Sequence, residues 1–249
     1  MRKIHFLPLV FLFLFALTTN AQEKGQLWYC DVETVLPSSI FDYQQMSKEL
    51  ADLAKENDFP FSFYIWSSRD LDYMIYYPIN SLEDIDEINQ AWDNMMEKWG
   101  KEKSSAFGQT KEGNRSFTFQ EDPTLSYLPE TSRLDPGDAK YLQYQEFGII
   151  PGKDDELKSV VADAYKLLSD KKYDDAWHMA RAGIGMNTPG LISWSFGKDR
   201  DDFYAQDKKF QNEFGEAFKP LNKRFISCIK RVKNVELFYQ KDFSYEKEN

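Results

Sequence analysis

Apolar and polar positions alternate along the chain with two different periods, and the order of these periods occurs twice. Aromatic-rich stretches with a two-residue alternation predict strands, and apolar stripes with a period near 3.6 residues predict helices. In the first half, the strand candidates are 27–37, 59–70, 73–79 and 117–127, and the helix candidates are 38–57 and 82–99. In the second half, the strand candidates are 141–151, 175–185, 191–197 and 237–245, and the helix candidates are 154–170 and 203–229.

The separation between matching positions indicates an internal duplication. It grows in small steps from 114 residues between Pro37 and Pro151 to 120 residues between Gln120 and Gln240. Insertions in loops would produce such steps. Each half has the order β-α-β-β-α-β, which is the ferredoxin-like unit. A single irregular α+β domain with two similar strand ends is the alternative.

A ferredoxin-like unit packs both helices on one face of its sheet, so the other face needs a cover. Two units can cover each other and form an eight-stranded barrel with helices outside. We therefore predict an α+β fold with two duplicated halves packed sheet to sheet. The predicted boundaries are a signal peptide at 1–21, a first half at 22–128, a linker at 129–140 and a second half at 141–249.

This strand order, together with the segment "LSYLPE" at 125–130, resembles the dimeric α-β barrel superfamily. NIPSNAP-like and antibiotic-biosynthesis-monooxygenase-like proteins are the similar members. The resemblance implies either cofactor-independent monooxygenase chemistry or haem handling, because members of the superfamily carry out both.

The N-terminus predicts export. Arg2 and Lys3 precede an apolar run, and small residues occupy the cleavage positions before Gln22. We therefore expect a periplasmic or extracellular protein with no membrane span in its mature chain. A retained anchor is the alternative, but the run is short for a span of ~20 residues.

The overall charge limits the class of partner. The chain has 41 acidic and 31 basic residues, which gives a net charge of −10. Nucleic acids and anionic lipids need clustered basic residues, so neither is an expected partner. We expect a small-molecule partner and either a monomer or a homodimer. Cys30 and Cys228 are expected to be two buried thiols, and a disulfide between them is the alternative.

The alternation within each strand assigns side chains to a cavity between the two sheets. In 59–70 it places Tyr64 and Trp66 inside. An offset of 115 residues then places Trp177 and Arg181 inside and His178 under the helices. The same reasoning puts Tyr29, Asp31, Glu33, Gln143, Gln145 and Phe147 inside. The candidate ligand-binding residues are Tyr29, Glu33, Tyr64, Trp66, Trp177 and Arg181, with His178 added if the register slips by one residue.

Each candidate also has a purely structural interpretation. Arg181 can be the partner of a buried carboxylate such as Glu33, and Trp66 can be an ordinary core residue. His178 is the only histidine after the signal peptide, so a histidine-rich metal site is not expected, and no metal is predicted. We predict no cofactor. Haem bound through His178 is the alternative.

The sequence contains no nucleophile elbow and no nucleotide-binding loop. Our main hypothesis is an exported protein that binds a small apolar or aromatic ligand between its sheets. The first alternative is a monooxygenase-like or haem-handling enzyme, and the second is a structural or interaction protein with a filled core. Whether the chain is an enzyme is left open.

Overall fold

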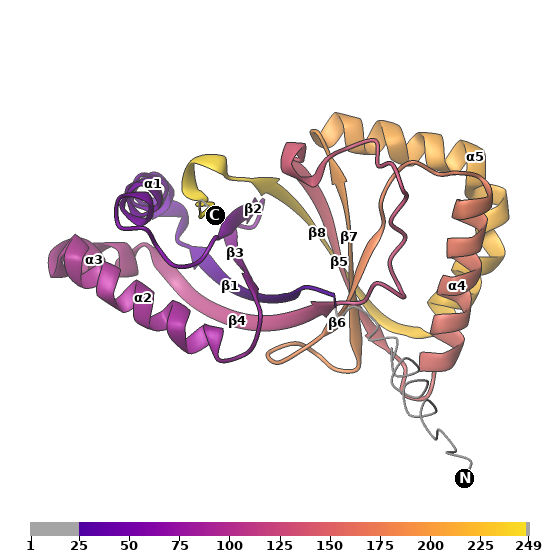
Figure 1. Ribbon diagram of the computed structural model, residues 1–249, viewed down its shortest axis with the longest axis horizontal. Coiled ribbons are helices and arrows are strands. Elements are labelled where there is room, and N and C mark those ends of the chain that lie inside the picture. Colours follow the sequence, from indigo (N-terminus) through magenta and orange to yellow (C-terminus); the bar gives the residue numbers. More distant parts are fainter. Residues whose placement is uncertain (1–24, 248–249) are drawn as a thin grey trace, which may run out of the picture.

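Eight strands form one closed antiparallel barrel in the computed structural model, which describes residues 25–247 (Figure 1). The order around the barrel is β1-β3-β2-β8-β5-β7-β6-β4. The strands are β1 (Leu27–Val35), β2 (Tyr64–Ser68), β3 (Asp72–Ile79), β4 (Lys111–Glu121), β5 (Tyr141–Ile149), β6 (His178–Ala182), β7 (Gly190–Gly197) and β8 (Ile229–Tyr239). The predicted signal peptide lies outside the described residues.

Five α-helices cover the outside of this barrel in the described part of the chain. They are α1 (Ile40–Glu56), α2 (Asp84–Trp99), α3 (Lys101–Gln109), α4 (Asp154–Asp170) and α5 (Arg200–Ser227). Figure 1 shows α1 to α3 beside the first four strands and α4 and α5 beside the last four. The predicted α+β barrel is therefore present. Among the described residues, no helix combines the length and the apolar character that a membrane crossing requires.

The two halves have the same strand order, β4-β1-β3-β2 and β8-β5-β7-β6. Matching strands begin 114 residues apart for the first two strands of each half and 118 residues apart for the last two. Gln120 therefore corresponds to Phe238, and its predicted match with Gln240 is wrong. The halves join where β2 pairs with β8 and β4 pairs with β6, and each of these ladders has only three residue pairs.

The sequence segments 117–127 and 237–245 add further contacts at these two short joins. Tyr127, just after β4, pairs with Trp177 of the other half, and Tyr245, just after β8, pairs with Phe63. The hydroxyl of Ser126 accepts a hydrogen bond from the Met179 amide at 2.9 Å. The hydroxyl of Ser244 accepts the equivalent bond from the Ile65 amide at 2.9 Å. Each half thus closes the barrel by the same contact with its partner half.

The barrel interior is filled by side chains of both halves. Trp66 and Tyr64 lie there, as predicted, with Cys30, Met74, Tyr76, Phe119, Tyr144 and Trp194. Tyr29 was expected in this interior, but it packs under the helices of the first half. Glu33 is on that side too, since its carboxylate accepts a hydrogen bond from Tyr43 of α1 at 2.7 Å. The predicted interior positions of Tyr29, Asp31 and Glu33 are therefore wrong.

The predicted facing of β6 is also wrong, because the true offset from β2 is 114 residues and not 115. A shift of one residue turns every side chain of a strand to its other face. Ala180 consequently packs in the barrel interior, and His178 stacks on Trp194 there. Met179 and Trp177 pack under the helices of the second half. Gln143, Gln145 and Phe147 of β5 also face those helices, and not the interior as predicted.

Both cysteines are free and buried, which confirms the expected pair of thiols. Cys30 belongs to the barrel interior and Cys228 to a cluster beside α4, so the two side chains lie on opposite faces of the barrel wall. A proline inside a helix usually kinks or breaks it, but α5 continues from Arg200 to Ser227 with Pro220 inside it.

Candidate functional site

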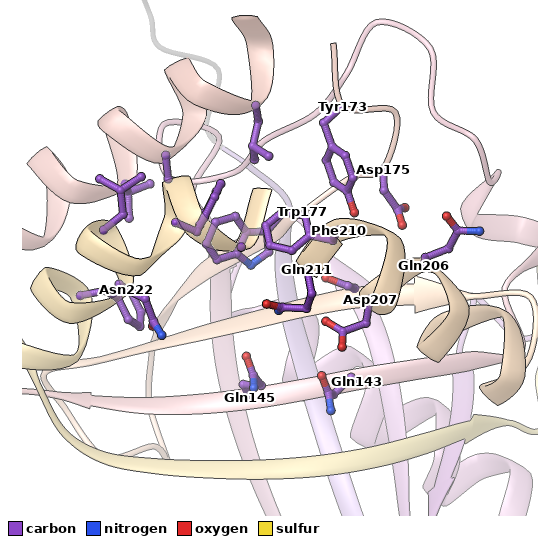
Figure 2. Close-up of a pocket in the computed structure, with 18 of the residues that line it drawn as sticks. Gln143, Gln145, Tyr173, Asp175, Trp177, Gln206, Asp207, Phe210, Gln211 and Asn222 are labelled. Carbon is purple, nitrogen blue, oxygen red and sulfur yellow. The ribbon is translucent and has the colours of Figure 1, made fainter. Parts of the chain in front are cut away.

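A cavity of about 630 Å³ lies between the second-half sheet and the two helices that cover it. Strands β5, β7 and β8 form its floor, α4 forms one wall, and α5 forms the other. Figure 2 shows Gln143 and Gln145 on the strand side, opposite Asp207 and Gln211 of α5. The cavity is therefore on the helix side of the sheet, and the sequence prediction placed it between the sheets.

In the first half the helices pack onto the sheet in one apolar cluster, and the second helix is broken. Gly100 has a φ of 101°, a left-handed value that favours glycine, and it separates α2 from α3. The turn brings Phe107 of α3 onto Tyr43 of α1, with ring centroids 5.3 Å apart. In the second half, α5 is continuous. Its residues Asp207 and Gln211 line the cavity and stay exposed, so this helix stands away from the sheet.

Smaller and more polar floor residues keep the second-half gap open. In the first half, Tyr29 and Tyr77 are cross-strand partners whose rings stack at 5.7 Å. The corresponding cross-strand pair in the second half is Gln143 and Ser195.

The helices that cover these pairs differ in the same way, with an apolar residue in the first half and a polar residue in the second. Ile88 of α2 and Gln206 of α5 occupy matching positions, because each follows the end of the preceding strand, β3 or β7, by the same number of residues. Ile88 is 0% exposed. Two aromatic rings and an aliphatic side chain fill the space in one half, and carboxamides and a hydroxyl border it in the other.

Polar groups of the floor form a short hydrogen-bonded row across three strands. The Ser193 hydroxyl donates to Gln145 Oε1 at 3.3 Å, and Gln145 Nε2 donates to Asn234 Oδ1 at 2.8 Å. Among the described residues, Gln143 and Ser195 have no side-chain hydrogen-bond partner, although both are half-buried. The floor can therefore offer hydrogen bonds to a molecule in the cavity.

One end of the cavity is acidic. Asp175 lines it and accepts a hydrogen bond from Arg133 Nε at 3.0 Å. Burial raises the pKa of Asp175, although the Arg133 guanidinium opposes this change. Burial also raises the pKa of the neighbouring Tyr173 hydroxyl, and the charges of Asp175 and Asp207 add to that rise. Asp207 forms no ion pair with any described residue. A negatively charged ligand group would therefore be repelled at this end.

Of the predicted site residues, Trp177 alone lines the cavity. Tyr64 and Trp66 lie in the filled interior of the barrel, and Tyr29 and Glu33 lie in the packed first half. Arg181 pairs with carboxylates, but Glu33 is not one of them. It binds Asp122 at 2.8 Å and Asp154 at 3.2 Å.

Three polar residues of α5 that line the cavity, Gln206, Asp207 and Gln211, were not predicted from the sequence. The sequence did contain a signal for them, because these polar residues lie on the apolar stripe of α5, where core-facing side chains are expected.

His178 is not available to a ligand in the cavity. Its ring stacks on Trp194 at a centroid distance of 5.3 Å with the planes 12° apart, and it packs edge-on against Phe196. Burial lowers the pKa of His178 to about 4. Its Nε2 atom is buried without a hydrogen-bond partner, so the side chain is held as a neutral ring inside the barrel.

These residues do not fit haem. The cavity lining contains no histidine, cysteine or methionine, and Tyr173 is the one tyrosine in it. A tyrosine must lose its proton to bind haem iron, and burial, together with the nearby carboxylates, raises the pKa of the Tyr173 hydroxyl and opposes that loss. Lys219 is the single basic residue of the lining, against Asp175, Asp207 and Glu216, which disfavours the two propionates of haem.

Known proteins resemble this chain in fold and not in sequence. No family model and no curated protein matches it. An anthrone oxidase-like protein has a TM-score of 0.57 at 14% identity, over 88% of this chain and 92% of that one. The chain has the dimeric α-β barrel fold.

Two further solved structures agree with this assignment. A proposed monooxygenase from Lactobacillus acidophilus NCFM has a TM-score of 0.53 at 7% identity, over 90% of this chain and 97% of that one. A mutant chlorite dismutase from Candidatus Nitrospira defluvii has a TM-score of 0.54 at 8% identity, over 87% and 92%. At these identities the likeness concerns the α-β barrel fold alone, and the resemblance inferred from the sequence is confirmed at that level.

Proposed function

We propose that this α-β barrel protein binds a small planar aromatic molecule between α4, α5 and the second-half sheet. The observation that carries this proposal is the contrast between the halves. The same place is filled by Tyr29 and Tyr77 in one half and is an open cavity of about 630 Å³ in the other. A stable fold gains from filling such a space, so an unfilled one of ligand size favours a binding role.

The lining favours a flat ring system. Aromatic side chains Trp177, Phe203, Phe210 and Phe225 surround the cavity, and Val160 and Val161 of α4 add an aliphatic wall. Rings of this kind pack well against aromatic ligands through offset or edge-on contacts. The ligand class predicted from the sequence is thus kept, while its proposed position moves to the other face of the sheet.

The matching strand orders also support the predicted gene duplication, which we retain as a proposal. In this view one copy kept a packed helix–sheet contact, and the other opened it for a ligand. Export likewise stays a proposal. N-terminal sequencing of the protein recovered from its native host would begin at Gln22 if the signal peptide is cleaved as predicted, whereas a chain that begins at Met1 would contradict it.

Thermal denaturation with a panel of planar aromatic compounds tests the binding proposal. A compound present at 100 times its Kd should stabilise the protein by about 2.7 kcal/mol. Ser195→Tyr, which introduces the residue found at the matching position Tyr77, should block the floor of the cavity and abolish the shift. Ser169→Tyr, at an exposed site of α4, is the matched control and should keep it. Binding that survives Ser195→Tyr would place the ligand elsewhere.

Oxidation of the bound aromatic molecule by dioxygen is a second candidate function. The fold neighbours include an anthrone oxidase-like protein and a proposed monooxygenase. In this chain, the specific observation is that Asp175 and Asp207 lie beside the Tyr173 hydroxyl at one end of the cavity. A carboxylate there could accept a proton from a ring-flanked CH₂ group. Reaction with O₂ would then give a carbonyl and one water.

Oxygen consumption with a ring-flanked methylene compound tests this candidate. Asp207→Asn should reduce the rate by at least about 100-fold if that carboxylate is the base, while the Kd for the compound changes little. The matched control is Asp201→Asn, at an exposed position in the first turn of α5. If the wild-type protein binds the compound and no oxygen is consumed, the protein is a binding protein without this activity.

A further inference from the structure

Strand β8 has one edge that lacks a partner strand over most of its length. On one side it pairs with β5 from Ile229 to Phe238. On the other side, β2 pairs only with residues 237–239. Five consecutive residues of β8, from Lys230 to Asn234, are exposed. β8 therefore joins the first half only by its last residues, and the rest of this edge is open.

The direction of the backbone groups shows which of them reach the open edge. In an antiparallel strand, the N–H and C=O groups of successive residues point to opposite neighbours. The Gln240 amide donates toward β2, to the Ile65 carbonyl at 2.8 Å. Alternation from this residue directs the backbone groups of Val232, Asn234 and Glu236 to the open edge. None of these backbone groups has a hydrogen-bond partner in the described part of the chain.

The equivalent edge of the first half is covered by a loop of the other half. Thr118 of β4 corresponds to Glu236 of β8, and its amide and carbonyl both bond to the loop 183–189, at 2.8 and 2.9 Å. The matching loop between β2 and β3 is only 69–71 and makes no such bonds to β8. The fold thus closes one edge with its own backbone and leaves the matching edge free to pair with another chain.

The open edge is basic, although the chain as a whole is acidic. Residues 217–235 contain six basic residues and no acidic residue, in a chain with a net charge of −10. Because side chains alternate, Arg231 and Lys233 lie on the same face of β8 as Val235, which packs against the barrel interior. Lys233 pairs with Glu146 at 3.7 Å, and Arg231 forms no ion pair with any described residue. Positive charge is therefore available beside the unpaired backbone.

This charge decides between two occupants of the edge. Two copies of β8 placed edge to edge would bring like charges together, and basic residues on an edge strand commonly prevent such pairing. An acidic strand meets no such repulsion. We infer that the open edge of β8 binds an acidic, extended segment of another protein as an added strand. This inference concerns the edge of the barrel and does not depend on the proposed aromatic ligand.

The geometry of the edge specifies how the segment lies. In line with β2 it runs antiparallel to β8, and about six residues cover the open edge at ~3.3 Å per residue. Residues of the segment opposite Val232 and Asn234 exchange backbone hydrogen bonds with β8. Those opposite Arg231 and Lys233 occupy the pairs without hydrogen bonds, in which side chains are closer together. We therefore expect acidic residues at every second position, on the face that meets the two cations.

Fluorescence anisotropy with a labelled peptide of four Glu-Val repeats, the acidic peptide, tests this inference at low salt. Its glutamates can face Arg231 and Lys233 while its valine amides pair with β8. Two matched peptides separate charge from strand pairing. Four Lys-Val repeats, the basic peptide, reverse the charge. The acidic peptide with N-methylated valines, the methylated peptide, keeps the charge and loses the amides that donate to β8.

Two protein variants change the same edge. Arg231→Glu reverses a charge that has no ion-pair partner among the described residues. Val232→Pro removes an N–H that points to the open edge and is not needed by the ladder with β5, which is a position where a strand tolerates proline. Lys208→Glu, at an exposed position of α5, is the control for the change in net charge.

We expect the wild-type protein and Lys208→Glu to bind the acidic peptide equally. Arg231→Glu and Val232→Pro should each bind it at least about tenfold more weakly, and the basic and methylated peptides should lose binding to the wild-type protein to a similar extent. If Val232→Pro does not fold, Arg231→Glu and the methylated peptide decide the question.

Three results would overturn the inference. The acidic peptide could fail to bind the wild-type protein, or bind Arg231→Glu as tightly. The methylated peptide could bind as well as the acidic one, which would show attraction by charge without strand pairing. Sedimentation could reveal a dimer that Val232→Pro dissociates, which would assign the edge to a second copy of the chain.

Discussion

Replacement of His178 by phenylalanine should make the protein less sensitive to mild acid. Burial lowers the pKa of His178 to about 4 from its ordinary value of 6.5. Between these two pH values, the unfolded chain binds a proton at this residue and the folded chain does not. Lowering the pH therefore favours the unfolded chain, and the stability that the neutral ring contributes is lost as the pH falls from 6.5 toward 4.

The size of this effect follows from the two pKa values. Each pKa unit corresponds to 1.36 kcal/mol, so the whole interval amounts to about 3 kcal/mol. Between pH 7.5 and pH 5, the part already lost is about 2 kcal/mol. His178→Phe preserves an aromatic ring against Trp194 and Phe196 but cannot take up a proton. It also removes a buried nitrogen that has no hydrogen-bond partner.

Urea denaturation at several values between pH 7.5 and pH 5 measures this linkage. Carboxylates are common to both proteins, so the difference between wild type and His178→Phe isolates the histidine. We expect the variant to gain about 2 kcal/mol relative to wild type as the pH falls to 5. Parallel stability curves, or an NMR titration that places the His178 pKa near 6.5, would show that the ring is not held as described.

Three other predictions concern the ion pair, the joins and the thiols. Arg133→Met should lower the free energy of unfolding, measured by urea denaturation, by about 2 to 3 kcal/mol, because it leaves the partly buried carboxylates of Asp175 and Asp202 without their cation. The same change at the exposed Arg200 should alter the free energy of unfolding by no more than about 0.5 kcal/mol. Ser126→Ala and Ser244→Ala should each lose about 1 kcal/mol, since each hydroxyl holds one join of the barrel, and clearly unequal losses would contradict the equivalence of the joins. Both cysteines should react with a thiol reagent only after unfolding, and rapid reaction of the native protein would contradict their burial.

The sequence by itself determined the order of most elements. It missed α3, and the last strand of each half, predicted over 117–127 and 237–245, begins earlier, as β4 and β8. The strand candidates alternate apolar and polar residues, the helix candidates follow the 3.6-residue period, and these local patterns survive in the folded chain. The predicted stripe of the helix over 203–229 became α5, and the strand candidates 175–185 and 191–197 became β6 and β7. The repeated order was enough to predict a barrel of two sheets, because a ferredoxin-like sheet has one face without helices.

The sequence could not decide which face of a strand looks into the barrel. In this fold both faces are covered, one by the opposite sheet and one by helices, so apolar side chains occur on both. In β1, Trp28 and Cys30 are as suitable for a core as Tyr29, and the choice of the polar set as the inner one was wrong. A one-residue error in the offset then reversed the facing of His178 and Arg181.

The cavity beside α5 was decided by tertiary structure alone. It exists because a continuous α5 stands away from a floor of Gln143, Gln145 and Ser195, while Gly100 lets the matching helices of the first half close onto theirs. Local sequence fixes the dihedral angles and the apolar stripe of a helix. The distance between that helix and a sheet depends on the summed volumes of side chains that are far apart in the chain, and only the folded structure brings those together.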